Sequence, residues 1–335
     1  MTTIKDIAAR AGVTPTTVSN VLHNRTERVS AETVRRVREI IQETGYVPNM
    51  SARSLVGSSS RIIAVISSLV PLSCGGFFQD SFHSVLLSGI EQAVRREGYF
   101  LMVRTVEDAG ELQSLLTNWN IDGLIMTGLF PDSLYQELTQ LGKPFVQIDS
   151  QGSTDSLRVL LQDEQGGYLA ARYLLEMGHR DILFCCPPRS KSPVVVDRYR
   201  GFLRAMREKG IDFPEERVIE SEFANTEGIE TGKLLAERDD FTAVFATADT
   251  LACQLCTGLM LGGRRIPEEI SVVGFDDTAV SRMNCPPLTT VHQDIAGRGE
   301  KAVEMLVRAI RTGENAPPYM FPVHLIERDS VRRIG

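Results

Sequence analysis

The chain has 335 residues, of which 42% are hydrophobic and 24% are charged, with 27 glycines and 15 prolines. These values are typical of globular proteins, so they exclude disordered, collagen-like and coiled-coil chains, and the length predicts two or three domains. The longest nearly apolar stretch, Ile62 to Leu72, is about half of the roughly 20 residues that a membrane helix needs. The first residues contain no apolar leader, so we expect a cytoplasmic protein with no membrane partner.

The net charge of −7 is unevenly distributed. Residues 1–60 contain eight lysines and arginines against five acidic residues, whereas the remainder is strongly acidic. This asymmetry indicates a small basic head that meets a polyanion and an acidic body that stays away from it.

Three short helices are predicted in the head. The first has a Thr-x-x-Asp start, the second has a proline at its first helical position, and the third has a stripe of valine and isoleucine. Their predicted starts and ends are Thr3 and Gly12, Thr14 and His23-Asn24, and Ser30 and Gly45.

The first two helices are joined by a tight Gly12-Val13 link, which is typical of a helix-turn-helix that places its second helix in the major groove of DNA. A small helical bundle with no DNA role would show the same spacing. The basic charge of the head favours the DNA-binding interpretation.

The body has the pattern of an α/β protein. Apolar runs typical of buried strands alternate with helical segments such as residues 85–98, which predicts parallel sheets with helices on both faces. The body is too long for one sheet, so we expect two doubly wound lobes with a ligand cleft at the carboxyl ends of their strands. The predicted strands are residues 61–66, 99–103, 123–126, 144–148, 181–185, 243–246 and 270–275.

The usual marks of an enzyme are missing from the sequence. No Gly-x-Gly-x-x-Gly, Gly-x-x-x-x-Gly-Lys-Ser/Thr, Gly-x-Ser-x-Gly or His-Glu-x-x-His motif follows a predicted strand, so we expect no catalytic residue and no cofactor. Cys253-Gln-Leu-Cys256 has the spacing of a metal or redox site, but no second cysteine pair or nearby histidine follows it. We therefore expect no metal site.

Two segments of the head have a more specific pattern: Thr3-Ile-Lys-Asp-Ile-Ala-Ala-Arg-Ala-Gly-Val-Thr-Pro-Thr-Thr-Val-Ser-Asn-Val-Leu22 and Gly45-Tyr-Val-Pro-Asn-Met-Ser-Ala-Arg-Ser-Leu55. They resemble the head and hinge of the lactose-repressor (LacI/GalR) family of bacterial transcription regulators. The resemblance covers essentially the whole chain. Matching body segments, in the family's order, are Gly178-His-Arg180, Asp197-Arg-Tyr-Arg-Gly-Phe202, Ile270-Ser-Val-Val-Gly-Phe-Asp-Asp277, Leu288-Thr-Thr-Val291 and Leu325-Ile-Glu-Arg-Asp-Ser-Val331.

The resemblance implies a domain order. We expect a helix-turn-helix domain at 1–47, a hinge helix and linker at 48–60, and a two-lobed effector-binding and dimerisation domain at 61–335. The two doubly wound α/β lobes would be of periplasmic-binding-protein type. Lobe 1 is expected at about 61–160 plus 292–320, and lobe 2 at about 161–291 plus 321–335.

The predicted DNA contacts lie on the second helix and the hinge. Asn20 stands where the family often has arginine, so we expect it to prefer adenine over guanine. Leu55 resembles the family's wedge residue that parts a base step, although it could instead fill a domain interface. The predicted DNA-binding residues are Thr3, Pro15, Thr16, Thr17, Ser19, Asn20, Asn49, Ala52, Arg53 and Leu55.

The predicted effector contacts are strand-end residues and positions that match the family. Asp276 follows a predicted strand, and Arg198 is expected to open a helix; the resemblance implies that both hold ligand hydroxyls. An ion pair that closes the lobes without ligand specificity is the alternative. Leu161-Gln162 and Ala248 depart from residues frequent in the family, so the pocket differs from that of well-known relatives. The predicted effector-binding residues are Phe82, His83, Asp149, Arg198, Phe223, Asp249 and Asp276.

The leading interpretation is a homodimeric repressor of a carbohydrate-utilisation operon. It would bind a pseudo-palindromic operator in double-stranded DNA, under the control of a sugar or sugar derivative. The sequence after Val331 leaves no room for a leucine-rich tail, so we expect dimers rather than tetramers. Two alternatives remain: a two-lobed sugar-binding receptor without a DNA role, and a regulator that responds to a nucleobase or a phosphorylated carrier protein.

Overall fold

The computed structural model describes residues 2–22, 25–46, 59–67, 78, 80–106, 109–128, 138–140, 142–149, 157–221 and 226–335. The chain divides into two compact units, Met1–Ser60 and Arg61–Gly335. In the described part of the chain, no helix has both the length and the apolarity needed to cross a bilayer.

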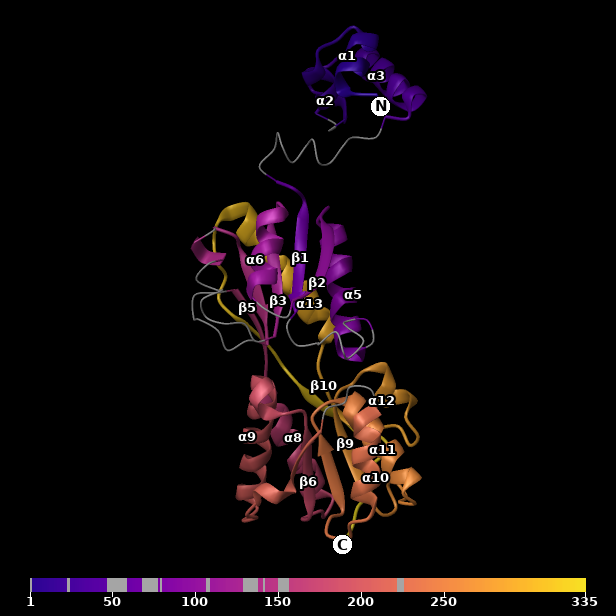
Figure 1. The fold of residues 1–335 in the computed structure, drawn as a ribbon, viewed down its shortest axis with the longest axis vertical. Coiled ribbons are helices and arrows are strands. Elements are labelled where there is room, and N and C mark those ends of the chain that lie inside the picture. The colour runs from indigo at the N-terminus through magenta and orange to yellow at the C-terminus, as the bar shows by residue number, and fades with distance from the viewer. Residues whose placement is uncertain are drawn as a thin grey trace. The chain divides into compact units, whose positions relative to one another are not determined.

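The first unit is a bundle of three helices, α1 (Ile4–Ala11), α2 (Pro15–Leu22) and α3 (Ala31–Thr44) (Figure 1). The predicted helix starts are confirmed: Thr3 and Asp6 form a capping box on α1, and Ser30 caps α3. Gly12 and Gly45 end their helices in the left-handed conformation that favours glycine. The apolar stripes meet in one core that includes Ile7, Val18, Val21, Val37 and Ile40.

Lobe 1 of the second unit is built on a six-stranded parallel sheet. Its strand order is β11-β5-β4-β3-β1-β2. The strands are β1 (Ile62–Ser67), β2 (Phe100–Thr105), β3 (Gly123–Thr127), β4 (Phe145–Ile148), β5 (Leu157–Leu161) and β11 (Tyr319–Phe321).

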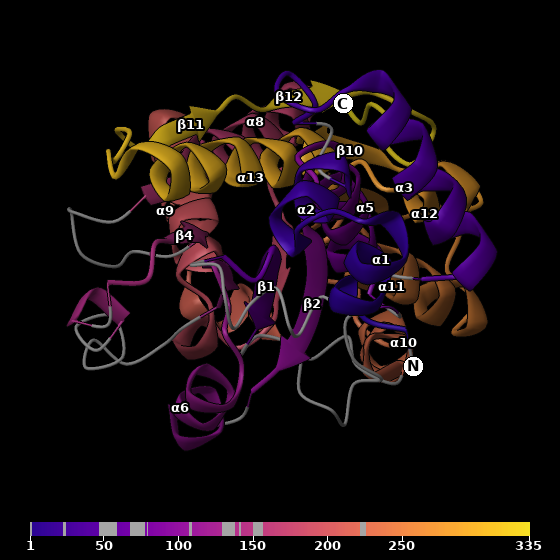
Figure 2. The same cartoon turned by 90° about the horizontal axis from the view of Figure 1, so that it is seen from above.

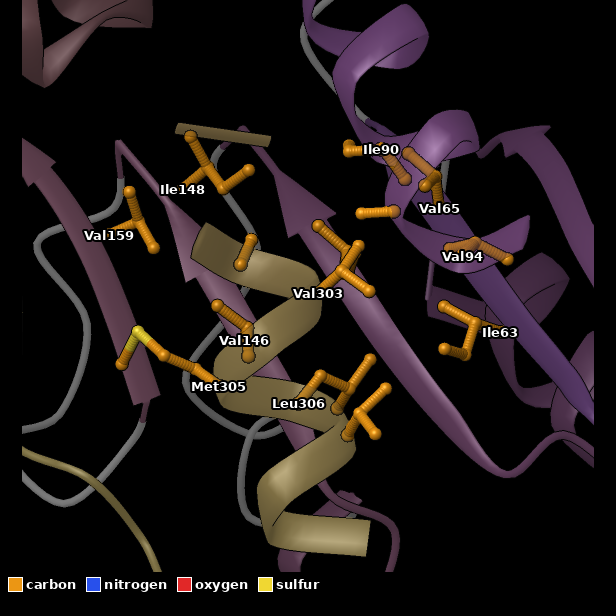
Figure 3. Packing of buried hydrophobic residues seen from close by; sticks show 14 of the residues in the cluster. Ile63, Val65, Ile90, Val94, Val146, Ile148, Val159, Val303, Met305 and Leu306 are labelled. Atoms are coloured by element: carbon orange, nitrogen blue, oxygen red, sulfur yellow. The ribbon is translucent and has the colours of Figure 1, made fainter. Parts of the chain in front are cut away.

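Helices cover both faces of this sheet. On one face α5 (Ser81–Arg96) and α13 (Ile295–Thr312) pack against residues such as Ile63 and Val146, and Figure 3 shows Val303 and Leu306 of α13 filling this core. On the other face α6 (Ala109–Asn118) covers a second core that contains Ile66. Figure 2 shows α6 and α13 on opposite sides of the strands. Alternate residues of the buried strands therefore enter two separate cores.

Lobe 2 contains a second six-stranded sheet, in the order β12-β10-β9-β8-β6-β7. Among its described strand pairs, β10–β12 is antiparallel and the others are parallel. Five helices accompany it (Figure 1). The strands are β6 (Ile182–Cys186), β7 (Val218–Glu220), β8 (Ala243–Ala246), β9 (Ser271–Asp276), β10 (Thr289–His292) and β12 (His324–Ile326). The helices are α8 (Asp163–Glu176), α9 (Pro193–Glu208), α10 (Glu227–Ala236), α11 (Asp249–Leu261) and α12 (Ala279–Met283).

The chain passes between the two sheets three times: from β5 to α8, from β10 to α13, and from β11 to β12. Each lobe is therefore assembled from separated parts of the sequence. The predicted α/β fold class with two doubly wound lobes is confirmed, and the predicted strands start or end within two residues of the observed ones. The predicted hinge helix falls mostly in residues 47–58, outside the described residues.

Candidate functional site

The predicted DNA-reading face lies on α2. Pro15 and Thr16 are exposed, whereas Thr17, Ser19 and Asn20 are half-buried. Val18 and Val21 of the same helix are buried in the head core, so they set which side of α2 faces outward. The described structure thus leaves the side chain of Thr16 exposed, and those of Ser19 and Asn20 partly exposed, for contacts outside the head.

Two threonine hydroxyls orient the starts of these helices. The Thr14 hydroxyl accepts a hydrogen bond from the Thr17 backbone N–H at 3.2 Å, so Thr14 caps α2, as the sequence pattern predicts. The Thr3 hydroxyl accepts from the Asp6 N–H at 3.3 Å and donates to the Asp6 carboxylate at 2.8 Å. The hydroxyl and the backbone N–H of Thr3 both donate to the Asp6 carboxylate, and these two hydrogen bonds hold the pKa of Asp6 below its usual value. Thr3, a predicted DNA contact, is thus already engaged as a cap.

Five predicted site residues lie outside the described residues. They are Asn49, Ala52, Arg53 and Leu55 of the predicted hinge, and Phe223 of the predicted effector site.

The second unit contains a cavity of about 210 Å³ with walls from both lobes. Five of the predicted effector-binding residues line it: Phe82, His83, Asp149, Arg198 and Asp276. Asp149 directly follows β4 and Asp276 is the last residue of β9, so both lie at strand ends, as the strand-end argument predicts. The other lining residues are Asp80, Gly128, Pro187, Pro188, Ser192, Pro193, Val194, Val195, Thr247, Ala248 and Thr250.

Arg198 is fixed by three contacts before any ligand is considered. Its Nε donates to Asp163 at 2.8 Å, its Nη1 donates to the Thr247 carbonyl at 2.6 Å, and its Cζ lies 3.6 Å from the centre of the Phe275 ring. Burial raises the pKa of Asp163 to about 6, although the Arg198 charge opposes this. The expectation that Arg198 opens a helix is wrong, because α9 begins at Pro193, a residue favoured at the first helical position.

Two glycines let α8 and α9 approach closely enough to hold Arg198. A Cβ atom on Gly167 of α8 would lie 1.9 Å from the Arg198 carbonyl oxygen, and one on Gly201 of α9 would lie 1.7 Å from the Glu164 carbonyl oxygen. No side chain fits at either position without a shift of the backbone.

The carboxylates of Asp149 and Asp276 are also held from behind the cavity wall. Asp276 accepts a hydrogen bond from the Gln293 amide at 2.6 Å, and Asp149 accepts one from the Arg298 guanidinium. Burial raises the pKa of Asp276 well above its usual value, although the charge of Arg198 opposes this. Both aspartates have positive φ angles, 61° at Asp149 and 114° at Asp276, so the backbone turns sharply where each strand ends.

Asp80 and His83 form a pair at the start of α5. Asp80 caps the helix by accepting from the His83 N–H at 2.9 Å, and it also bonds the His83 ring Nδ1 at 2.5 Å. Burial alone would raise the pKa of Asp80, but the hydrogen bond and charge of His83 outweigh it and lower that pKa. A carboxylate is thus kept ionised at the cavity wall.

Asp249 lies behind the cavity wall rather than in it. Its side chain is fully buried and accepts hydrogen bonds from the Thr278 N–H at 2.8 Å and the Thr290 hydroxyl at 2.6 Å. Asp249, a predicted effector contact, therefore lies in the interior of lobe 2 and does not line the cavity.

Several residues of the cavity were not found by sequence reasoning. Asp80 and Thr250 line it, and the Thr247 hydroxyl is buried there without a hydrogen-bond partner among the described residues. Gln293 and Arg298 stand one layer behind the wall. Asp80 had a detectable signal, since an aspartate three residues before His83 matches a helix cap. Thr247 directly follows the predicted strand at 243–246, so the strand-end argument could also have found it. Gln293 and Arg298 are brought behind the wall by the crossing from β10 to α13, which no local pattern predicts.

A larger open groove of about 1000 Å³ lies between α8 and the β11–β12 crossing. Two ion pairs lie along it, Arg204 with Glu164 at 2.6 Å and Arg172 with Glu176 at 3.3 Å. Because the smaller cavity lies where β4 of lobe 1 and β9 of lobe 2 both end, it is the better candidate site. In the described residues, no group of three or more His, Cys, Asp or Glu side chains is placed to hold a metal.

Two family descriptions match the chain. Residues 3–49 match bacterial regulatory proteins of the lacI family, and residues 171–331 match a periplasmic binding protein-like domain. The first covers the three-helix head, and the second covers most of lobe 2 with α13.

Full-length relatives and solved structures agree with these matches. The chain is 34% identical over 345 residues to the HTH-type transcriptional repressor PurR of Vibrio vulnificus, covering 100% of both chains, and 36% identical to that of Pasteurella multocida, covering 99% of both. A Lac repressor dimer bound to operator and the anti-inducer ONPF aligns with a TM-score of 0.83 at 26% identity, covering 99% of both chains. A complex of the transcriptional regulator CelR with cellobiose aligns with a TM-score of 0.73 at 29% identity, covering 98% of this chain and 100% of the other. The chain therefore belongs to the lacI family of bacterial regulatory proteins and is a DNA-binding transcriptional repressor, not an enzyme.

Proposed function

We propose that this repressor is controlled by a small, neutral, hydroxyl-rich effector, a sugar, bound in the cavity between the lobes, and that it regulates genes of carbohydrate use. The observation that supports this is the charge of the cavity wall. Three carboxylates, Asp80, Asp149 and Asp276, face one guanidinium, Arg198. Carboxylates accept hydrogen bonds from hydroxyl groups, and the guanidinium donates to hydroxyl or ring oxygens.

The same wall disfavours anionic effectors. Two like charges about 4 Å apart repel by roughly 4 kcal/mol at an effective dielectric of about 20, so the ionised Asp80 carboxylate would repel a phosphate or uronate beside it. Arg198 offers little compensation, because Asp163 already neutralises it at 2.8 Å.

Cavity size and solved neighbours support a small sugar. The volume of about 210 Å³ is below the roughly 300–1000 Å³ typical of sites for drug-sized ligands. The CelR structure holds cellobiose, and a lacI-family regulator from Enterococcus faecium, with a TM-score of 0.72 at 28% identity over 82% of this chain and 100% of the other, holds ribose.

A nucleobase is the second candidate. Phe82 provides an aromatic face at the wall, and the buried Thr247 hydroxyl could bond a polar ring edge. The N–H groups of a base can donate to carboxylates as hydroxyls do, so this candidate ranks second only because the solved neighbours named above hold sugars.

The head of each subunit would bind one half of a symmetric DNA operator. We infer a C2 dimer in which each α2 enters the major groove of one half-site. The solved Lac repressor dimer on its operator is the nearest parallel among the structures described above. A monomer at micromolar concentration, or a stable tetramer, in sedimentation velocity would contradict this assembly.

A thermal-shift screen of the full chain tests the effector class. The panel is D-ribose, D-glucose, cellobiose, ribose 5-phosphate, glucuronate, adenine and guanine. A neutral sugar should raise the melting temperature by mass action, and Asp276→Asn should abolish that shift. Asp212→Asn, an exposed aspartate of the same lobe, is the matched control and should retain it. A shift only with phosphates, glucuronate or bases would contradict the sugar proposal.

A further inference from the structure

Arg298 is a buried charge just behind the effector cavity. It lies in the first turn of α13, its side chain is among the largest that are fully buried, and it belongs to lobe 1. It does not line the cavity itself. A buried guanidinium is costly unless its hydrogen bonds are satisfied, so its partners are informative.

Those partners form a chain of three hydrogen bonds. Arg298 Nη2 donates to Asp149, and Arg298 Nη1 donates to the side-chain oxygen of Gln293 at 2.5 Å. The amide nitrogen of the same Gln293 donates to Asp276 at 2.6 Å. All of these side chains are at least four-fifths buried, and the chain ends at a cavity carboxylate on each side.

The two ends of this chain belong to different lobes. Asp149 follows β4 of lobe 1, Asp276 is the last residue of β9 of lobe 2, and Gln293 lies on the crossing from β10 to α13. The Gln293 amide and Arg298 thus join the two carboxylates. The amide oxygen accepts from Arg298 of lobe 1, and the amide nitrogen donates to Asp276 of lobe 2. A planar guanidinium can direct one N–H to each partner, which the single ammonium of a lysine cannot do with the same geometry.

We propose that Arg298 is a positioning residue for effector specificity: through Asp149 and Gln293 it fixes the spacing of the two carboxylates that grip the effector's hydroxyls from opposite lobes. The nature of the ligand in this proposal rests on the proposed function. The hydrogen-bonded bridge from Asp149 through Arg298 and Gln293 to Asp276 does not. Sugars whose hydroxyls match the fixed spacing bind, and epimers that satisfy only one carboxylate bind less tightly.

A purely structural role for Arg298 predicts something different. If the arginine only anchored α13, its removal would lower stability without changing how the loop after β9 is held, and its effect on binding would be independent of Asp149. A double-mutant cycle and hydrogen exchange distinguish the two roles.

The binding test uses calorimetric titration of the full chain with D-ribose, D-glucose and D-galactose. Arg298→Met and Gln293→Met should each weaken the tightest of these by about tenfold or more, as expected for loss of charge-assisted hydrogen bonds. Arg298→Met should cost little more in an Asp149→Asn background, because both act at one carboxylate. Arg308→Met, an exposed arginine of the same helix, is the control and should bind like wild type. Unchanged affinities, or full additivity with Asp149→Asn, would overturn the proposal.

The second readout needs no ligand. Arg298→Met and Gln293→Met should both speed hydrogen exchange at residues 274–278, in the lobe to which α13 does not belong. Faster exchange there supports the bridge even if none of the three sugars binds, a result that would contradict only the proposed sugar effector. Exchange at 274–278 equal to wild type in both variants would overturn the bridge.

Discussion

Replacing Asp249 by asparagine should make the protein more stable at pH 8 but not at pH 4. Asp249 is fully buried, and its described donors are neutral groups: the Thr278 N–H, the Thr278 hydroxyl at 3.3 Å and the Thr290 hydroxyl. Burial raises the pKa of Asp249 to about 6, although these hydrogen bonds oppose it. An asparagine can keep the pattern, because its oxygen accepts from Thr278 and its amide donates to the Thr290 oxygen once that hydroxyl rotates.

The magnitude follows from the difference between the folded and unfolded pKa values. The pKa of Asp249 rises from 3.8 to about 6, and one unit corresponds to about 1.4 kcal/mol, so the penalty approaches 3 kcal/mol. The folded state holds the proton more tightly, so this penalty is absent below pH ~4, grows as pH rises through ~4 to 6, and is complete above ~7. Subtracting about 1 kcal/mol for weaker hydrogen bonds leaves a net gain of about 1–2 kcal/mol at pH 8.

Urea unfolding of wild type and Asp249→Asn at pH 4, 6 and 8 measures this gain. The stability difference between the two proteins should increase with pH. Asp212→Asn, an exposed aspartate, should show no such trend. A difference independent of pH, or an Asn variant less stable than wild type at pH 8, would refute the account of Asp249 as a buried charge held by neutral donors.

Three further outcomes are expected. Asn20→Arg should shift base preference at its half-site position from adenine toward guanine in an operator-selection experiment, and identical selected operators would contradict this. Leu55→Ser should weaken operator binding in fluorescence anisotropy while leaving the effector affinity of the DNA-free protein unchanged; an unaltered operator affinity argues against a wedge. Gly201→Ala should lower the melting temperature, because overpacking against Glu164 costs about 1–3 kcal/mol and outweighs a helix-propensity gain of at most about 1 kcal/mol. A higher melting temperature would show that α9 can move without cost.

Much of the fold could be predicted because its signals are local. The Thr3 cap, the Gly12 and Gly45 ends and the buried runs such as 243–246 each depend on a few neighbouring residues, and the structure confirms them. The strands β7, β11 and β12 have three residues each, too few for any pattern.

The candidate site was predictable where the strand-end rule or the family resemblance applies, and Phe82, His83 and Arg198 come from the resemblance. Asp149 and Asp276 lie at strand ends, and that position alone brings both to the cavity. Asp249 also follows a strand, but the hydroxyls of Thr278 and Thr290 turn its carboxylate into the interior. Arg298 gave no signal, because in sequence it is an ordinary arginine near the start of an amphipathic helix. Its burial depends on the return of α13 to lobe 1.

That return has a consequence for synthesis of the protein on the ribosome. Val303 and Leu306 of α13 complete a core whose strands, β1 and β3 to β5, leave the ribosome far earlier (Figure 3). At about 5–20 residues per second, the roughly 150 residues between β5 and the end of α13 take on the order of 10–30 s to translate. Lobe 2 helices and most of its strands emerge within that interval as one continuous segment. The nascent chain must therefore keep the part of this sheet face that α13 covers exposed for many seconds, with only α5 packed on the rest, and the second lobe can fold before the first is finished.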